Sequence, residues 1–184
     1  MGNSYTISAP DCDTNYFEGA PPSLFCTQCG SYIGSEEFVP QLDIRQCDLD
    51  FCFTYDGRLL VSQRGKTYLS QHCATPLNFA AVDRSARYYS LHVVSSVAFD
   101  PVRRKTRFEK KCALCGNFES IVGATPAFIL ESEKVEEMGM YRTDLCFGSG
   151  REKSPVFVVG AALKDDLARN FVELDFEEVN PPLK

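Results

Sequence analysis

The chain has 184 residues, of which 44% are apolar and 24% charged, and its formal net charge at pH 7 is −6. This length and apolar content are enough to bury a hydrophobic core, which excludes a disordered or collagen-like chain. Prolines and glycines interrupt the longest uncharged stretch, so it cannot span a membrane, and we see no secretory signal. We therefore expect a cytoplasmic protein without a membrane partner, folded as a single domain over residues 1–184.

The first recognisable motif is Cys26-Thr27-Gln28-Cys29-Gly30. The two-residue gap lets both thiolates of a tight turn point at one metal ion, and the following glycine can adopt a positive φ. The segment before the motif is rich in proline and polar residues. We expect this end of the chain, residues 1–22, to be loosely held, together with residues 181–184.

Strand patterns follow the first motif. Apolar and polar residues alternate over residues 49–55, which predicts a half-buried strand with Asp48 and Asp50 on its solvated face. Asp56-Gly57 then predicts a hairpin turn into the strand that begins at Leu59. The uncharged residues 88–99 are rich in Val and Tyr and indicate a further strand.

A basic run precedes the second motif, and its members are Arg103, Arg104, Lys105, Arg107, Lys110 and Lys111. A basic hairpin stabilised by zinc could bind nucleic acid. However, Phe108 is the one aromatic residue within the run, and the chain as a whole is acidic. We therefore favour a solvated hairpin that neutralises nearby acids and thiolates. The second motif itself is Cys112-Ala113-Leu114-Cys115-Gly116.

The C-terminal part carries the acidic excess of the chain. Residues 127–130 indicate a strand, and the charged residues 131–140 form either a short helix or an exposed loop. An acidic surface favours basic partners and repels phosphate backbones. The candidate partner-binding residues are Glu131, Glu133, Glu136, Glu137, Glu173, Asp175, Glu177 and Glu178.

The nine cysteines, without an export signal, argue against a disulfide framework. Two CxxCG motifs supply four thiolates, and zinc fits that ligand set best. We predict that one structural zinc ion joins two distant parts of the chain, held by Cys26, Cys29, Cys112 and Cys115. A thiol oxidoreductase and unliganded buried thiols remain open alternatives. The other five are expected to pack as small hydrophobes: Cys12, Cys47, Cys52, Cys73 and Cys146.

An internal repeat relates two segments of the chain. Leu59-Leu60-Val61-Ser62 matches Phe157-Val158-Val159-Gly160 at an offset of 98, and Phe79-Ala80-Ala81-Val82 matches Phe176-Glu177-Glu178-Val179 at an offset of 97. Each unit is interpreted as strand, amphipathic helix and strand. We predict a duplication over about 24–99 and 107–179. The predicted fold is α+β, with two similar strand–helix–strand halves, mostly antiparallel sheet, and a four-cysteine zinc-knuckle pair joining them.

Catalytic motifs are missing from the sequence. We find no HExxH, GxSxG, P-loop or strand-linked GxGxxG pattern, and the two histidines, His72 and His92, belong to no motif. Four cysteines on zinc leave no open coordination position for catalysis. The sequence therefore predicts a protein that is not an enzyme.

The paired CxxCG motifs and the LLVS and FVVG units resemble the double-CxxCG motif proteins of bacteria, several of which are immunity proteins in contact-dependent toxin exchange. The units are also similar to wider families of polymorphic-toxin immunity proteins. The resemblance covers most of residues 24–179. It implies zinc ligation by the four motif cysteines and assigns no toxin-binding residue.

The resemblance implies a non-enzymatic cytoplasmic immunity protein that binds and neutralises a cognate bacterial toxin domain. An acidic face would steer a basic toxin to fast association. The alternative is a zinc-stabilised nucleic-acid-binding module that uses residues 103–111.

Overall fold

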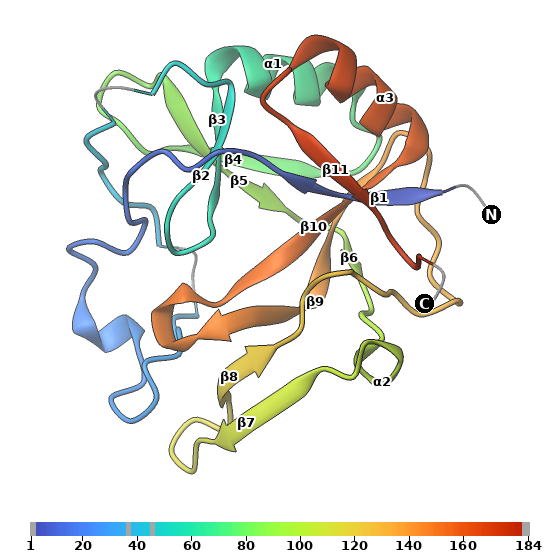
Figure 1. The fold of residues 1–184 in the computed structure, drawn as a ribbon. Coiled ribbons are helices and arrows are strands. Elements are labelled where there is room, and N and C mark those ends of the chain that lie inside the picture. Colours follow the sequence, from blue (N-terminus) through green and yellow to red (C-terminus); the bar gives the residue numbers. More distant parts are fainter. Residues whose placement is uncertain (1–2, 36–37, 45–46, 182–184) are drawn as a thin grey trace.

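Two β-sheets and two ten-residue helices form the fold (Figure 1), in a computed structural model that describes residues 3–35, 38–44 and 47–181. The larger sheet has the order β11-β1-β10-β9-β8-β7, with β6 parallel to β9; every other strand pair recorded in the two sheets is antiparallel. Its strands are β1 (Ser4–Ser8), β6 (Ser96–Val97), β7 (Arg107–Lys111), β8 (Phe118–Val122), β9 (Met140–Ser149), β10 (Ser154–Gly160) and β11 (Asp175–Glu178).

The smaller sheet has the order β2-β3-β5-β4, and its strands are β2 (Phe51–Phe53), β3 (Leu59–Ser62), β4 (Leu77–Ala81) and β5 (Tyr88–Val93). Helix α1 (Gln63–His72) follows β3 directly, and α3 (Ala161–Asn170) follows β10. The remaining helices are short: α2 (Pro101–Arg104), η1 (Pro22–Leu24) and η2 (Gly150–Glu152). The α+β class with mostly antiparallel sheets, predicted from the sequence, is confirmed.

The two strand–helix–strand units have the same topology. In the first unit β5 lies between β3 and β4, and in the second unit β1 lies between β10 and β11. Helices α1 and α3 begin 98 residues apart and also end 98 residues apart. The Ser62 hydroxyl caps α1 by accepting from the backbone N–H groups of Arg64 and Gly65, as expected. Common descent of the two units stays a prediction.

Equivalent contacts extend to single side chains. Tyr89 of β5 lies opposite Val61, and Tyr5 of β1 lies opposite Val159, which is the equivalent of Val61 at the same offset of 98. A lysine of the helix lies over each tyrosine ring: Lys66 Nζ is 3.8 Å from the centroid of Tyr89, and Lys164 Nζ is 5.2 Å from that of Tyr5. Strand β1 therefore has the place in the second unit that β5 has in the first.

The N-terminal segment differs from the expectation that residues 1–22 are loosely held. Residues 4–8 form β1 inside the larger sheet, and Ile7 is 5% exposed in the main core. Pairing with β10 and β11, both more than 140 residues away in the chain, overrides the weak local pattern. Residues 1–2 and 182–184, also expected to be loose, lie outside the described residues.

Several predicted strands have different bounds. The segment 88–99 is divided into β5 and β6, and 127–130 contributes a single bridge between Ile129 and Phe99. Residues 131–139 contain no helix, so the loop alternative holds there, while Met140 begins β9. Strands β8 and β9 had no sequence prediction, because their apolar residues do not alternate cleanly.

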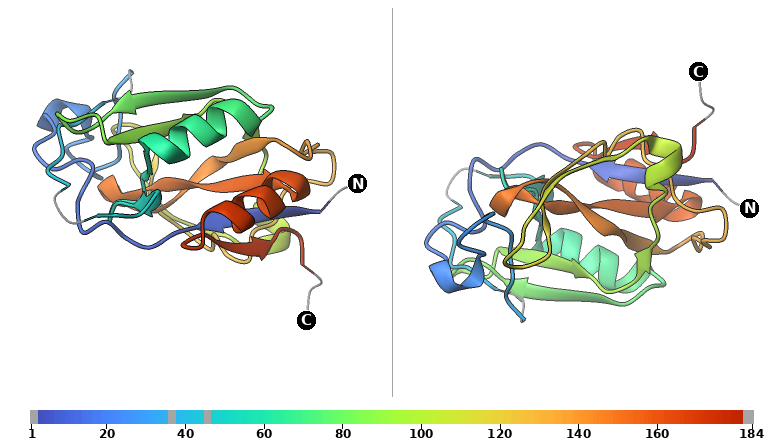
Figure 2. Two further views of the ribbon diagram at one scale, coloured as in Figure 1. Left: turned by 90° about the horizontal axis from the view of Figure 1, so that it is seen from above. Right: turned by 90° about the horizontal axis from the view of Figure 1, so that it is seen from below.

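The helices share one hydrophobic core with both sheets. Seen from above, α1 and α3 lie side by side over the strands (Figure 2, left). Leu69 of α1 and Leu163 and Leu167 of α3 are fully buried in one cluster with Phe51 and Phe171. Burial of a leucine side chain contributes about 1.5–3 kcal/mol, so this cluster couples the two units. Among the described residues, no helix combines the length and apolar character needed to cross a bilayer.

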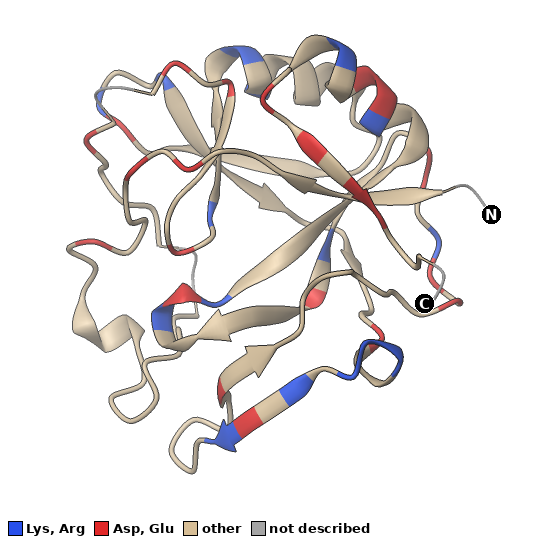
Figure 3. Ribbon diagram, viewed as in Figure 1, with Lys and Arg blue, Asp and Glu red and all other residues tan. Residues whose placement is uncertain are grey.

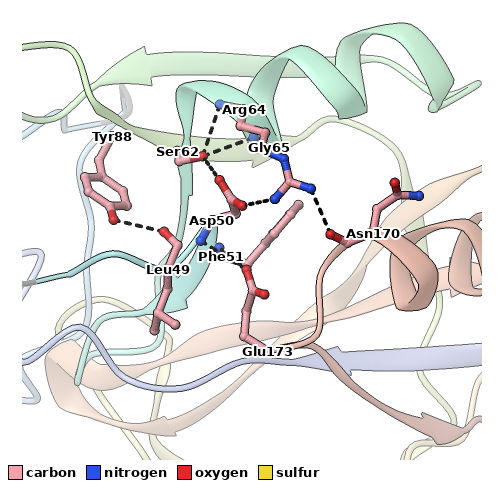
Figure 4. Close-up of polar contacts among 9 residues, drawn as sticks. All are labelled: Leu49, Asp50, Phe51, Ser62, Arg64, Gly65, Tyr88, Asn170 and Glu173. Carbon is pink, nitrogen blue, oxygen red and sulfur yellow. Dashed lines mark hydrogen bonds and ion pairs between the residues drawn. The ribbon is translucent and has the colours of Figure 1, made fainter.

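A polar network also joins the two units (Figure 4). The Asp50 carboxylate accepts hydrogen bonds from Ser62 Oγ and from Arg64, whose Nη2 reaches the backbone oxygen of Asn170 at 2.9 Å. Glu173 Oε1 accepts from the backbone nitrogens of Asp50 (3.0 Å) and Phe51 (3.2 Å). Asp50 was expected on a solvated strand face; instead its carboxylate anchors α1, because β2 begins only at the next residue.

Candidate metal centre

The first CxxCG motif folds into a tight turn after η1. The Cys26 backbone N–H donates to the Ser31 oxygen at 2.8 Å, and the Gly30 N–H donates back to the Cys26 oxygen at 2.8 Å. Gly30 has a φ of 71°, a left-handed value that disfavours residues with a side chain. These contacts place both motif sulfurs on the same side of the turn.

The second motif forms the turn between β7 and β8. Its hydrogen bonds repeat the first pattern: Cys112 N–H to the Asn117 oxygen at 2.8 Å, and Gly116 N–H to the Cys112 oxygen at 3.0 Å. Gly116 has a φ of 76°. Both glycines therefore have the positive φ expected of a metal-binding knuckle.

The two turns bring four sulfur atoms together. Cys26 and Cys112 Sγ are 3.7 Å apart, Cys29 and Cys115 Sγ are 3.5 Å apart, and all four lie within 4.8 Å of one another. Tetrahedral thiolates about 2.3 Å from a zinc ion are separated by about 3.8 Å. The four predicted ligands are thus close enough to hold one metal ion, across a gap of 82 residues between Cys29 and Cys112.

Charge in the cluster is unevenly distributed. The hydroxyl and backbone N–H of Ser31 lower the pKa of Cys29 to about 6, and the backbone N–H groups of Cys29 and Gln28 lower the pKa of Cys26. The N–H of Asn117 favours the Cys115 thiolate, but burial and the neighbouring sulfurs outweigh it and raise the pKa of Cys115 to about 11. Four thiolates this close repel one another, and a divalent cation would offset that repulsion.

A lysine outside both motifs connects the two turns. Lys153 Nζ donates to Ser31 Oγ at 2.6 Å and to the backbone oxygen of Phe118. Ser31 Oγ lies 3.1 Å from Cys29 Sγ, so the lysine acts on the cluster through that hydroxyl. Such outer contacts orient metal ligands. No sequence pattern indicates this role for Lys153, because it belongs to no motif and reaches the site only through the β9–β10 hairpin.

The other five cysteines lie outside this cluster, and all nine are free. Cys52 is fully buried, and Cys12 and Cys47 are partly buried in the same hydrophobic cluster. Contact with the Cys12 thiol and burial raise the pKa of Cys52, which keeps it protonated. Cys73 packs against the main core at the end of α1. Cys146 differs, because it lines a cavity beside the metal centre.

The acidic candidates gather at one edge of the larger sheet. Strand β11 is the first strand of that sheet, and Asp175, Glu177 and Glu178 are exposed on it (Figure 3). The 131–137 loop contacts the first turn of α3, where the Glu137 backbone oxygen accepts from the Leu163 backbone N–H at 2.9 Å. Glu131, Glu136 and Glu137 are exposed and Glu133 is half-buried. Glu173 is half-buried, and its carboxylate accepts hydrogen bonds from the backbone N–H groups of Asp50 and Phe51.

The basic candidates are divided between two elements at the opposite edge of the sheet. Arg103 and Arg104 lie on α2, and Lys105 follows it. The exposed strand β7 carries Arg107, Lys110 and Lys111, of which two pair with acids: Arg107 with Glu109 at 4.0 Å and Lys110 with Glu119 at 3.6 Å. The Arg103 guanidinium lies over the Phe128 ring, and Arg104 donates to the Thr125 oxygen.

Comparisons of this chain with family models, curated proteins and solved structures gave no match.

Proposed function

We propose that the protein is a non-enzymatic immunity protein in which a structural zinc ion joins the two halves and the outer surface binds a cognate bacterial toxin domain. The observation that carries this proposal is the four-sulfur cluster, since the two motifs that form it carry the resemblance to the double-CxxCG proteins. Four thiolates fill a tetrahedral coordination shell, which suits a structural ion.

Zinc is the favoured ion because a tetrahedral set of four thiolates suits zinc or iron, and zinc undergoes no redox change. We expect one zinc ion per chain by elemental analysis, and less than one tenth of that in a Cys112→Ser variant. Cys146→Ser is the matched control and should keep its zinc. Purification with stoichiometric iron, or with thiols that react fully in the absence of a chelator, would contradict this assignment.

The proposed toxin-binding surface, which we call the acidic edge, consists of Glu131, Glu133, Glu136, Glu137, Asp175, Glu177 and Glu178. Glu173 is excluded because its carboxylate already accepts hydrogen bonds from the backbone N–H groups of Asp50 and Phe51. An acidic patch beside an edge strand suits a basic protein partner, through charge attraction and through the unpaired backbone groups of β11.

Co-expression with the toxin domain encoded by a neighbouring gene tests this proposal. The protein should restore growth and co-purify with the toxin. Reversal of Asp175, Glu177 and Glu178 to lysine should slow association at least tenfold at low salt, whereas Lys110→Glu on the opposite edge should not. Absence of both protection and a complex would refute the immunity function; equal binding by the triple variant would refute the acidic edge.

Nucleic-acid binding is the second candidate, and it is favoured by one observation: all five residues of β7 are exposed at a sheet edge that carries Arg107, Lys110 and Lys111. This candidate predicts retention on DNA or RNA that falls steeply with added salt. Failure to bind either nucleic acid at low salt would remove it. The ion pairs with Glu109 and Glu119 reduce the charge available to phosphate, so we rank it below toxin binding.

A further inference from the structure

A cavity of about 640 Å³ lies between the two sheets and beside the metal centre. Leu91 and Val93 of β5 line one wall, Phe157 of β10 lines another, and Ser31 and Asn117 from the two cysteine turns border it. This volume is within the range of about 300–1,000 Å³ typical of small-molecule sites. The cavity therefore has the size of a ligand site, at a place where distant parts of the chain meet.

Three cationic side chains line the cavity: Arg58, Arg142 and Lys153. Arg58 follows the β2–β3 turn, which is pressed against β10, since a Cβ atom built on Gly57 would lie 2.2 Å from Ser154 Oγ. All three positive charges act on Cys146: burial raises the pKa of this thiol, and the three cations oppose the rise. All three cationic residues line the same cavity as Cys146.

These cations have no carboxylate partner within the described residues. Arg142 Nε donates to the Val93 oxygen at 3.2 Å and Lys153 to oxygens of Ser31 and Phe118. None of the ion pairs recorded among the described residues involves any of the three. Arg58 Nε is buried and lacks a hydrogen-bond partner in the part of the chain described. Asp144, which also lines the cavity, accepts from the Phe99 backbone N–H at 2.9 Å. Among the described lining residues, positive charge therefore exceeds negative charge.

Aromatic rings form much of the remaining wall: Phe17, Tyr32, Phe38, Phe108, Phe118 and Phe157. The Phe17 ring lies 4.9 Å from the Arg58 guanidinium carbon, so an apolar face and a cation are adjacent. Rings arranged in this way accept a planar apolar group by stacking. A ligand that uses both features would have a planar ring and a negatively charged group.

We propose that this cavity binds a small aryl phosphate, with its phosphate group among Arg58, Arg142 and Lys153 and its ring against the aromatic wall. Guanidinium groups donate two parallel hydrogen bonds to phosphate oxygens, and three cations match a dianion better than a carboxylate. Arg58 Nε is buried and lacks an acceptor among the described residues, which is costly, and a bound phosphate would supply that acceptor. This inference goes beyond toxin binding and does not depend on it.

Calorimetric titration of the zinc-loaded protein with 1-naphthyl phosphate tests the proposal. We expect it to bind at least tenfold more tightly than either 1-naphthol or inorganic phosphate, because each lacks one of the two recognised groups. Arg58→Gln and Arg142→Gln should each weaken binding by about tenfold to a hundredfold, through loss of a charged hydrogen bond. Arg84→Gln, at an exposed position outside the lining, is the matched control and should bind as the parent protein does.

A second measurement needs no variant. Alkylation of Cys146 by iodoacetamide, followed by mass spectrometry, should slow at least fivefold in saturating 1-naphthyl phosphate, while alkylation of Cys73 should not change. Competition by adenosine monophosphate would identify nucleotides as the source of the aryl phosphate; lack of competition would indicate a non-nucleotide aryl phosphate. Equal affinity for 1-naphthol and its phosphate, or no protection of Cys146, would overturn the proposal. Loss of toxin binding would leave it unaffected.

Discussion

Buried carboxylates hold the tight turns of the smaller sheet. Asp56 accepts from the backbone nitrogens of Tyr16 and Phe17, both at 2.8 Å, and so fixes the N-terminal loop to the β2–β3 turn. Asp83 holds the turn between β4 and β5, where its carboxylate accepts hydrogen bonds from the Ser85 hydroxyl and from the Tyr88 backbone N–H. Burial opposes ionisation of Asp83, but these hydrogen bonds outweigh it and lower its pKa below 3.8.

The lowered pKa of Asp83 has a predictable effect on stability. A carboxyl whose folded pKa is depressed contributes stability above its unfolded pKa and loses that contribution as the pH falls through the folded pKa. Asp83→Asn should lower the free energy of unfolding by about 1–3 kcal/mol at pH 7, because an amide cannot accept both hydrogen bonds. Urea denaturation should show this difference shrinking below about pH 3.8, the ordinary carboxyl value. The exposed Asp175→Asn is the control; a difference constant from pH 7 to pH 3 would contradict the assignment.

At the scale of elements, the two helices are equivalent in what they bury. Leu69 of α1 and Leu167 of α3 are both 0% exposed, in one shared cluster. Each helix also ends in the same way, since the N–H groups of Cys73 and Phe171 donate to the oxygens of Leu69 and Leu167 at 2.9 Å. Neither unit encloses its core alone, so the helices stabilise each other's sheet.

Truncation of either leucine should therefore destabilise the whole protein by a similar amount. Leu69→Ala and Leu167→Ala should each lower the free energy of unfolding by about 2–5 kcal/mol, through lost burial and the remaining cavity. Val172→Ala, at a position 95% exposed, should change it by less than about 0.5 kcal/mol. A single cooperative transition is expected for both leucine variants in chemical denaturation. Two separate transitions would show that the units fold independently.

At the scale of the whole molecule, the four-cysteine cluster joins the N-terminal Cys26 turn to the β7–β8 hairpin. Strand β7 pairs with β8, and β8 pairs with β9 at just two positions, Ser120 and Ile121. Because β8 has so few paired positions with β9, the contact between the Cys112 turn and the Cys26 turn is a main attachment of the β7–β8 hairpin to the rest of the fold. Binding of an ion there adds directly to folding stability.

Removal of the metal should loosen this hairpin first. A chelator should lower the free energy of unfolding by about 4 kcal/mol, if free zinc in the loaded sample stands a thousandfold above its dissociation constant. Hydrogen exchange should accelerate in β7 and β8, while β3 and β10, buried in the core, stay protected. Uniform acceleration, or none, would contradict a local clamp. Return of zinc should restore the slow exchange.

Local patterns determined part of this protein. The CxxCG spacing sets two turns whose glycines have positive φ, Ser62 caps α1, and the i, i+4 spacing of Leu163 and Leu167 sets the buried face of α3. Each of these features depends on residues within one turn of one another. For that reason the four clustered cysteines and both strand–helix–strand units were predictable from the sequence.

Tertiary structure decided the rest. Three contacts join residues more than thirty positions apart. They are the pairing of β1 with β10 and β11, the hydrogen bonds of Lys153 to Ser31 and Phe118, and the hydrogen bond from the Asp50 backbone N–H to Glu173. Such contacts leave no periodic pattern, because the partner is set by how the sheets pack. The cationic cavity between the sheets has the same origin: Arg142 and Lys153 belong to the β9–β10 hairpin, and Arg58 joins them only once the smaller sheet packs against the larger one.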